Sequence, residues 1–488
     1  MTLDPGYRVV IGLETHVQLK TASKMFCRTS AAYASAPPNT LVCPICLGMP
    51  GVLPVINATA VDLTIMTGLA LHSEIPPHAK FDRKNYAYPD LMKWYQISQY
   101  DLPLCVGGWL EIKADGETRR VNITRVHLEE DTAKLTHVVG DDGQPASLID
   151  VNRSGVPLME IVSEPDLTSA AEAMAYGLKL RNILRWLGVS TANMQDGALR
   201  IDANVSVWPS DAEIGNAKVE VKNMNSFRAL GQALDFEIER QIALYESGER
   251  LVQETRGWDE SASRTVPQRT KEYAHDYRYF PEPDLPPLTI TRERVEGLTA
   301  RMPVLPDAVR QRLVGDLGVA PTDADELIED RDLTAYTLDV IERHGGPAAE
   351  VVTWVLQDVR RLLNARELAS EDMPIAAASM AQLLDLRAKG DLSSTMAGTV
   401  LEEMFATGKS PEAIVAARGR QISDTDALVE IAREILAANP QAVADYHAGK
   451  DRAIQFLMGQ VMRRTRGQAN PGKVTELLRV ELADDGGE

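Results

Sequence analysis

A short segment near the N-terminus, Tyr7 to Leu19 (YRVVIGLETHVQL), carries a carboxylate and an imidazole two residues apart. Its apolar residues alternate with other residues, which is the pattern of a β-strand with one buried face. Because successive side chains of a strand point to opposite faces, Glu14 and His16 share one face, and Leu13 and Val17 share the other. A carboxylate beside an imidazole can form half of a metal site or of an acid/base pair. The alternative is an edge strand whose polar side chains face water.

Two further segments place carboxylates among apolar neighbours, Leu128–Asp131 (LEED) and Leu158–Ile161 (LMEI). An unpaired buried charge is costly, so such carboxylates need a cation. One histidine with several carboxylates is an oxygen-rich set that suits Mg²⁺ or Mn²⁺ better than a closed zinc cage, and Mg²⁺ commonly serves phosphate chemistry. These residues therefore indicate a magnesium site that works on ATP.

Two more alternating segments, 198–207 and 217–222, each carry three polar residues on one face. These residues are Arg200, Asp202 and Asn204 in the first segment and Lys218, Glu220 and Lys222 in the second. Such faces line a cleft, or they form an exposed sheet surface with cross-strand ion pairs. The two segments alone leave both interpretations open.

Three of the four cysteines could form a metal site: Cys27 and the Cys-x-x-Cys pair Cys43 and Cys46. A structural zinc site needs four ligands, and Thr29 stands where a second thiol beside Cys27 would supply the fourth. Cys105 is too distant in the sequence to be assumed as a replacement. A structural zinc held by Cys27, Cys43 and Cys46 is therefore the less favoured interpretation.

Bulk properties indicate a multidomain globular protein of the cytosol. A chain of 488 residues exceeds what one hydrophobic core usually organises, so we expect two to four domains. No apolar run approaches the roughly 18 residues of a membrane span, and the N-terminus lacks the basic and then apolar build of a secretory signal. The net charge of −19 repels polyanions on average, so a nucleic-acid partner would need local basic patches.

The first 290 residues predict a mixed domain of strands and helices. One helix is expected after Ser169, whose spacing to the glutamate three residues later fits a capping box, and it should end at Gly188. Another is expected between Ser226 and Gly248, where apolar residues recur at helical spacing.

The chain beyond this domain is predicted to be almost entirely helical. The proline-dense stretch 280–288 (FPEPDLPPL) should continue neither a helix nor a strand, so we expect a rigid connector and a domain boundary near residue 290. A weaker boundary near residue 408 gives three predicted domains, 1–290, 291–408 and 409–488. The last contains a cluster of cations, which in isolation is most often a solvated helix face. These residues are Lys450, Arg452, Arg463, Arg464, Arg466 and Lys473.

Long, irregular motifs carry a resemblance over essentially the whole chain. They include VIGLETHVQLKTASKMFC, CPICLGMPGVLPVIN, FDRKNYAYPDL, HLEEDTAKLTH, DVNRSGVPLMEIVSEPD, LRIDANVSV, VEVKNMNSFRAL and HDYRYFPEPDLPP. In this order they resemble the B subunit of aspartyl/glutamyl-tRNA amidotransferase, the GatB family. The C-terminal DYHAGKDRAIQFLMGQVMRRTRGQANPGKVTELLRVEL resembles the YqeY-type tail of that family.

The resemblance implies a fold and a reaction. The fold would be α+β, with a cradle of antiparallel sheet and helices followed by a helical domain and a helical tail. The protein would act in a complex with an amidase, GatA, and a small subunit, GatC. It would use ATP and Mg²⁺ to phosphorylate the side-chain carboxylate of Glu-tRNA(Gln) or Asp-tRNA(Asn), and ammonia from glutamine would then complete a carbon–nitrogen ligase reaction. The sequence does not decide which tRNA is the substrate.

The resemblance also assigns residues. It implies metal ligation by His16, Glu130 and Glu160, with Glu14 beside them and Glu129 as the neighbour most easily confused with Glu130. Arg200, Lys222 and Asn223 are expected on the phosphate or acceptor-end side of the cleft. The cations of the tail become candidates for contacts with tRNA phosphates. Thr29 departs from the zinc-bearing members, and Met92-Lys93-Trp94 departs from the Pro-Lys-Gly of many relatives.

Two rival hypotheses from other classes remain at this point. One is a stand-alone metal-dependent ligase or hydrolase that acts on a small acid. The other is a non-catalytic scaffold that binds tRNA and uses its acidic cluster only for structure.

Overall fold

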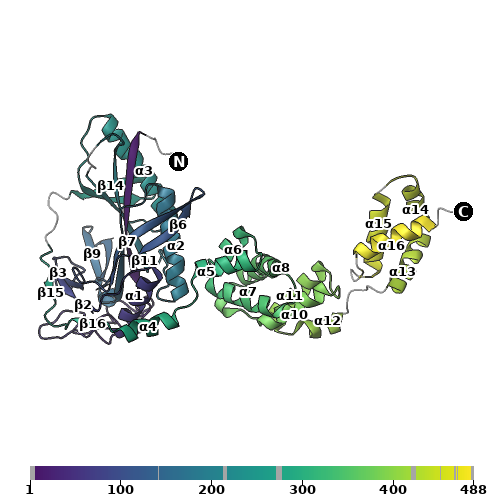
Figure 1. Cartoon of the computed structure of the whole chain (residues 1–488), viewed down its shortest axis with the longest axis horizontal. Coiled ribbons are helices and arrows are strands. Elements are labelled where there is room, and N and C mark those ends of the chain that lie inside the picture. Colours follow the sequence, from purple (N-terminus) through teal and green to yellow (C-terminus); the bar gives the residue numbers. More distant parts are fainter. Residues whose placement is uncertain are drawn as a thin grey trace. The chain divides into compact units, whose positions relative to one another are not determined.

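The structure is a computed structural model that describes residues 6–140, 142–212, 217–270, 277–418, 425–450, 452–465, 469 and 471–484. The chain divides into two compact units, Met1–Pro306 and Asp307–Glu488. The first combines a large β-sheet with helices, and the second is built from helices (Figure 1). The predicted α+β fold with a helical C-terminal part is confirmed.

The large sheet of the first unit has nine strands among the described residues. Eight follow the order β14-β13-β12-β11-β1-β10-β7-β5, and β6 pairs with β7. Neighbours are antiparallel except β12 and β13, which are parallel. The strands are β1 (Tyr7–Gln18), β5 (Cys105–Val106), β6 (Trp109–Ala114), β7 (Glu117–Glu130), β10 (Pro157–Ser163), β11 (Leu199–Pro209), β12 (Val219–Lys222), β13 (Glu254–Asp259) and β14 (Arg264–Thr270).

One face of this sheet is apolar and shares a single hydrophobic core with helices α1 (Ala58–Ala70), α2 (Ala170–Leu187) and α3 (Phe227–Glu246) (Figure 1). The predicted alternation in β1 is confirmed, because Leu13 and Val17 are buried in this core. Glu14 and His16 therefore lie on the opposite, polar face.

The caps of the two predicted helices are where the sequence placed them. The Ser169 hydroxyl accepts a hydrogen bond from the backbone N–H of Glu172 at 3.2 Å, and α2 ends at Gly188 with φ +69°. The Ser226 hydroxyl accepts from the backbone N–H of Ala229 at 3.0 Å at the start of α3. Each cap satisfies a donor that the first helical turn leaves unpaired.

Short sheets accompany the large one. A three-stranded sheet contains β15 (Phe280–Pro281), β3 (Asp82–Asn85) and β4 (Tyr95–Ser98). Two-stranded sheets join β16 (Leu288–Thr289) to β2 (His78–Ala79) and β8 (Lys134–Val139) to β9 (Pro145–Asp150), and a 3₁₀ turn η1 (Val151–Arg153) follows.

The prediction that residues 280–288 form only a connector is wrong. Both ends of this stretch form two-residue strands, β15 and β16, that pair with strands of the first unit. A proline is tolerated there because so short an edge strand needs few backbone donors. Helix α4 (Arg292–Arg301) then packs on α1, with Arg294 Nε 2.8 Å from Asp62, so the first unit extends beyond residue 290 to Pro306.

The second unit is a succession of helices. It comprises α5 (Pro306–Gln311), η2 (Arg312–Asp316), α6 (Pro321–Leu327), α7 (Arg331–Arg343), α8 (Ala348–Trp354), η3 (Val355–Val359), α9 (Arg360–Ala365), η4 (Ser370–Asp372), α10 (Ala377–Ala388), α11 (Ser394–Thr407), α12 (Pro411–Arg418), α13 (Thr425–Ala438), α14 (Pro440–His447), α15 (Arg452–Arg464) and α16 (Pro471–Asp484). Helices α13 to α16 enclose a hydrophobic cluster of their own. Within the described ranges, no helix combines the length and the apolar character needed to cross a membrane.

Candidate functional site

The polar face of the large sheet brings four distant segments together. The antiparallel register sets His127, Glu160, His16 and Arg200 in one row across β7, β10, β1 and β11. Residues directly opposite each other in a sheet point to the same face, so their side chains are neighbours. The strand found in the sequence is therefore a central strand of the sheet, and the edge-strand alternative is excluded.

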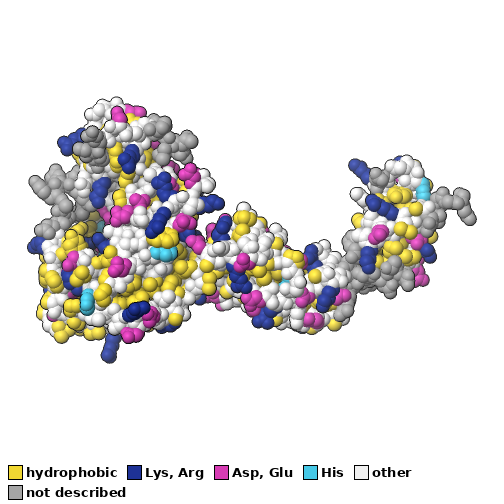
Figure 2. All heavy atoms as spheres, in the orientation of Figure 1, with side chains coloured by type: hydrophobic (Ala, Val, Ile, Leu, Met, Phe, Trp, Pro, Cys, Tyr) yellow, Lys and Arg dark blue, Asp and Glu magenta, His cyan; other side chains and the backbone are white. Residues whose placement is uncertain are grey.

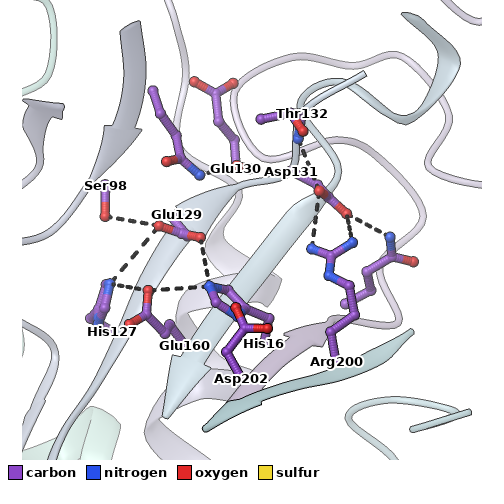
Figure 3. A network of polar contacts seen from close by, with 12 residues as sticks. His16, Ser98, His127, Glu129, Glu130, Asp131, Thr132, Glu160, Arg200 and Asp202 are labelled. Atoms are coloured by element: carbon purple, nitrogen blue, oxygen red, sulfur yellow. Dashed lines mark hydrogen bonds and ion pairs between the residues drawn. The ribbon is translucent and has the colours of Figure 1, made fainter. Parts of the chain in front are cut away.

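Three side chains of this face converge on one point (Figure 3). His16 Nε2 lies 3.4 Å from a carboxylate oxygen of Glu160 and 3.8 Å from one of Glu129. The ligand atoms that the three residues offer all lie within 4.8 Å of one another. The Glu129 side chain is 3% exposed and that of Glu160 is 11% exposed, so both carboxylates lie largely out of water. This triad of His16, Glu129 and Glu160 is the candidate functional centre.

Two neighbouring side chains hold the triad in place. The Ser98 hydroxyl on β4 donates to Glu129 at 3.2 Å, and His127 Nε2 lies 3.4 Å from Glu160. Burial lowers the pKa of His127 to about 4, so this imidazole is neutral near pH 7. It therefore orients Glu160 without adding a positive charge.

The triad has two carboxylates and only one imidazole, so its negative charges outnumber its positive one. Burial raises the pKa of Glu129, and the nearby carboxylate of Glu160 raises it further. Burial would also raise the pKa of Glu160, but His127, which becomes charged at acid pH, and His16 hold it below its usual range. Burial lowers the pKa of His16, yet Glu160 and Glu129 outweigh that effect and raise it to about 9. Two buried carboxylates that share one imidazole have the charge and oxygen donors that suit a divalent cation.

Glu130 does not belong to this triad, which corrects the ligand set expected from the sequence. Its carboxylate accepts from the backbone N–H of Ile97 at 3.0 Å and pairs with the ammonium of Lys93. Neighbouring residues of β7 point to opposite faces, so Glu129 and Glu130 cannot both face His16. The carboxylate that joins His16 and Glu160 is Glu129.

The other predicted cleft residues lie around the triad. Glu14 accepts from the side-chain amide of Asn204 at 2.9 Å. Arg200 donates both terminal nitrogens to Asp131, at 3.1 and 3.2 Å. Lys222 Nζ lies 2.5 Å from Asp202 and 3.1 Å from Glu220, and Asn223 is exposed just after β12 with φ +66°. Lys222 thus forms a cross-strand ion pair with Asp202 of β11 and a second ion pair with Glu220 of its own strand.

Sequence reasoning missed Lys84, and it did not foresee that Asp131 pairs with Arg200. The Lys84 ammonium lies 4.8 Å from the ring centre of Tyr277 and 5.8 Å from that of Tyr86. Burial would lower its pKa, but the charges of Glu129 and Glu160 are among those that raise it. The spacing of Lys84 and Tyr86 in FDRKNYAYPD was the available signal, since residues two apart in an extended segment point to the same side.

The three predicted thiols are brought together at a separate place. The candidate ligand atoms of Cys27, Cys43 and Cys46 lie within 4.8 Å of one another, and the two sulfurs of the Cys-x-x-Cys pair are 3.5 Å apart. A hydrogen bond from the Cys27 thiol is the main factor that lowers the pKa of Cys46, to about 4. Cys105 does not join them, because it is buried in the main core. Among the described residues this group has three sulfur ligands.

The predicted cations of the tail lie at the surface of its helices. Arg452, Arg463, Arg464 and Lys473 are exposed, Lys450 Nζ lies 3.0 Å from Asp445, and Arg464 lies 3.7 Å from Glu434. Arg466 lies outside the described residues. Basic and acidic side chains are interspersed over the described part of the face shown in Figure 2.

Comparison with known proteins gives one consistent result. Residues 9–296 match the family model described as the GatB/GatE catalytic domain, and residues 336–482 match the one described as the GatB domain. The chain is similar to proteins named as the B subunit of aspartyl/glutamyl-tRNA(Asn/Gln) amidotransferase. The relative from Moorella thermoacetica is 55% identical over 478 residues, which cover 98% of this chain and 100% of the relative. Those from Dehalococcoides mccartyi (strain CBDB1) and Thermomicrobium roseum are each 51% identical, over 98% of this chain and 99% of the relative.

Proposed function

Because the chain belongs to the GatB family of aspartyl/glutamyl-tRNA amidotransferase subunits, we propose that it activates a carboxylate carried on tRNA at the expense of ATP. The side-chain carboxylate of Glu-tRNA(Gln) or Asp-tRNA(Asn) attacks the γ-phosphorus of ATP, which releases ADP and leaves an acyl phosphate. Ammonia then attacks the acyl carbon, phosphate leaves, and the amide is formed. The enzyme class is a carbon–nitrogen ligase that uses glutamine as the ammonia source.

The chemistry explains why a phosphoryl-transfer site is needed. A carboxylate is a poor acylating agent because its leaving group would be an oxide, whereas an acyl phosphate releases phosphate. Charge spreads over the oxygens of the transferring phosphoryl group, so positioned cations stabilise the transition state. The single observation that supports this assignment is the convergence of His16, Glu129 and Glu160 beside Lys84 on a sheltered sheet face.

The triad fits Mg²⁺. Its donors are two carboxylates and one imidazole, and the carboxylates lie so close together that Glu160 disfavours the charge of Glu129. His16, Glu129 and Glu160 would hold the ion. When bound, Mg²⁺ offsets the negative charge of the ATP phosphates.

The remaining residues would position the two substrates. The Lys84 ammonium would donate to phosphate oxygens above the triad. Asp131 fixes the Arg200 guanidinium in a two-pronged contact, which would direct its remaining donors at an anionic group in the cleft. Lys222 and Glu14 flank the same face, and Asn223 would contact an acceptor end at its rim.

The assembly and the tail extend the proposal. The word subunit in the relatives' names implies a larger complex, and we propose GatA and GatC as its other members, in the cytoplasm. The exposed cations of α15 and α16 would contact the tRNA backbone, with Arg466 as a further candidate.

The separate core of α13 to α16 supports the division into domains 1–290, 291–408 and 409–488, with the first boundary moved toward 306. The thiol group would carry no resident zinc, because it offers three of the four ligands that such a site needs.

The test is reconstitution with GatA and GatC, followed by assays on each misacylated tRNA. We expect ATP cleavage to require a misacylated tRNA and amide formation to require glutamine or ammonia. Efficient ligation of a free amino acid would instead support the stand-alone ligase. Amidation that survives loss of both Glu129 and Glu160 would support the scaffold hypothesis.

A further inference from the structure

A cavity of about 420 Å³ opens on the polar sheet face beside the triad. It follows β1 from Glu14 toward the N-terminus and lies between residues of β10, β11 and Lys218. The residues that matter for its chemistry are Val10, Gly12, Glu14, Asn204, Trp208 and Lys218. All of them belong to the described part of the chain, and the cavity is separate from the thiol group.

Gly12 lines the cavity without contributing a side chain. Gly12 shares the polar face of Glu14 and His16 but contributes no Cβ. A Cβ added at Gly12 would come no nearer than 3.6 Å to Pro165, which is an ordinary contact. The pairing of β10 with β7 also shifts register between Val162 and Ser163, at the cavity wall. A Cβ therefore fits at Gly12 without a backbone shift, which permits a substitution there.

The walls combine a flat apolar surface with a polar rim. Val10, Pro165 and the indole of Trp208 supply the apolar part. The Arg8 guanidinium carbon lies 5.7 Å from the centre of the indole ring and restrains it. Asn204 and Glu14, joined by a 2.9 Å hydrogen bond, form the polar rim nearest to the triad. Pockets of this size and composition take small ligands, and an aromatic wall with polar edges suits the stacked base and hydroxylated ribose of a nucleoside.

The position of the cavity relates it to the reaction. Gly12 lies four residues before His16 on the same strand, which is about 13 Å at the usual strand rise. A nucleoside bound there would extend its attached group along β1, past Glu14, to the triad. Both substrates of the proposed reaction carry an adenosine with the reacting group at a distance from the base. In ATP the reacting group is the γ-phosphate, and in the charged tRNA it is the side-chain carboxylate on the terminal adenosine.

We propose that this cavity binds the adenosine of one of the two substrates, ATP or the aminoacylated end of tRNA. The proposal rests on the function proposed above. It assigns Trp208 as the stacking surface and Gly12 as the position that leaves room for the ligand.

The test fills or opens the cavity in the reconstituted complex. Gly12→Val places a branched side chain in the hollow, and valine suits a strand. Trp208→Ala removes the stacking surface from a side chain that is half-buried at the cavity lip. Trp109→Ala is the matched control, since Trp109 is also a half-buried strand tryptophan with an arginine, Arg120, 4.3 Å from its ring centre. Circular dichroism and thermal unfolding of each complex would establish that the variants are folded.

We expect Gly12→Val and Trp208→Ala to raise the KM of one substrate about tenfold or more, the size of one base-stacking interaction, with the other KM unchanged. A rise confined to ATP identifies the ATP adenosine, and a rise confined to the charged tRNA identifies its terminal adenosine. Unchanged KM values for both substrates in the folded variants would overturn the proposal. That result differs from failure of the proposed function, in which the unmodified complex itself would show no tRNA-dependent ATP cleavage.

Discussion

Replacing Glu129, Glu130 and Glu160 one at a time by glutamine would separate the ligand set of the structure from the one expected from the motif alone. Glutamine keeps the shape of glutamate and removes its charge. In the structure Glu129 and Glu160 face His16, whereas Glu130 pairs with Lys93. We therefore expect Glu129→Gln and Glu160→Gln to weaken Mg²⁺ binding strongly and Glu130→Gln to leave it nearly unchanged.

The magnitude follows from the burial of the two carboxylates. Their side chains are 3% and 11% exposed, and the ligand atoms of the triad lie within 4.8 Å of one another, so water screens an ion seated among them poorly. Removing one partner of a buried ion pair costs about 3–5 kcal/mol. At 1.4 kcal/mol per factor of ten, the Kd for Mg²⁺ should rise at least about a hundredfold.

The assay is the thermal stability of the protein during a titration with Mg²⁺, because an ion that binds only the folded state raises the melting temperature. The unmodified protein and Glu130→Gln should show the same Mg²⁺-dependent rise, at similar concentrations. Glu129→Gln should lose this rise. Without Mg²⁺ it should melt above the unmodified protein, because the repulsion between Glu129 and Glu160 is removed.

Two results would refute the reasoning. If Glu130→Gln loses the Mg²⁺-dependent stabilisation and Glu129→Gln keeps it, the motif-based ligand set was right and the geometric one is wrong. If none of the three variants changes the titration, the ion does not bind at the triad.

Three further predictions concern Lys84, the thiol group and the tail. Lys84→Met should raise the KM for ATP about tenfold or more while keeping Mg²⁺-dependent stabilisation, since the role proposed for Lys84 is to bind the ATP phosphates and not the metal; an unchanged KM in steady-state kinetics would contradict this. Thr29→Cys should bind about one Zn²⁺ per chain by elemental analysis because it completes a four-thiol set, and the unmodified protein should bind far less; equal zinc contents would show that the fourth thiol is not what is missing. Replacing Arg463, Arg464 and Arg466 together by glutamate should weaken tRNA binding and reduce its salt dependence by roughly 0.7 to 0.9 in log–log slope for each phosphate that is no longer neutralised. Unchanged tRNA affinity in that variant would exclude this surface from tRNA binding.

The local features of this protein were available from its sequence. The two-residue period of β1 set Glu14 and His16 on one face, and the caps at Ser169 and Ser226 marked the starts of α2 and α3. Such signals are local, because side-chain direction and capping depend on a few neighbouring residues. The long irregular motifs likewise identified the family from the sequence alone.

The contacts of the segment Leu128–Asp131 could not be predicted from such local signals. All four of its residues are buried, and although Val126 and Leu128 alternate with His127 and Glu129 in the sequence, this alternation does not tell which partner strand each face meets. Pairing with β10 and the packing of β4 decided which carboxylate faces His16. The prediction for the proline-rich stretch 280–288 was wrong for a related reason. Its composition argued against strands, but its two ends form strands by pairing with β3 and β2.

The sequence by itself therefore determined the fold class, the family and the faces on which the candidate residues lie. Only the tertiary structure decided which residues meet, which are Glu129 rather than Glu130 at the triad and Asp131 with Arg200, and that Gly12 lines a cavity. The physical reason is that the alternation of side chains is set within a single strand, whereas the register depends on how two strands pair. A shift of one residue between β1, β10 and β7 would bring a different set of side chains to the same place.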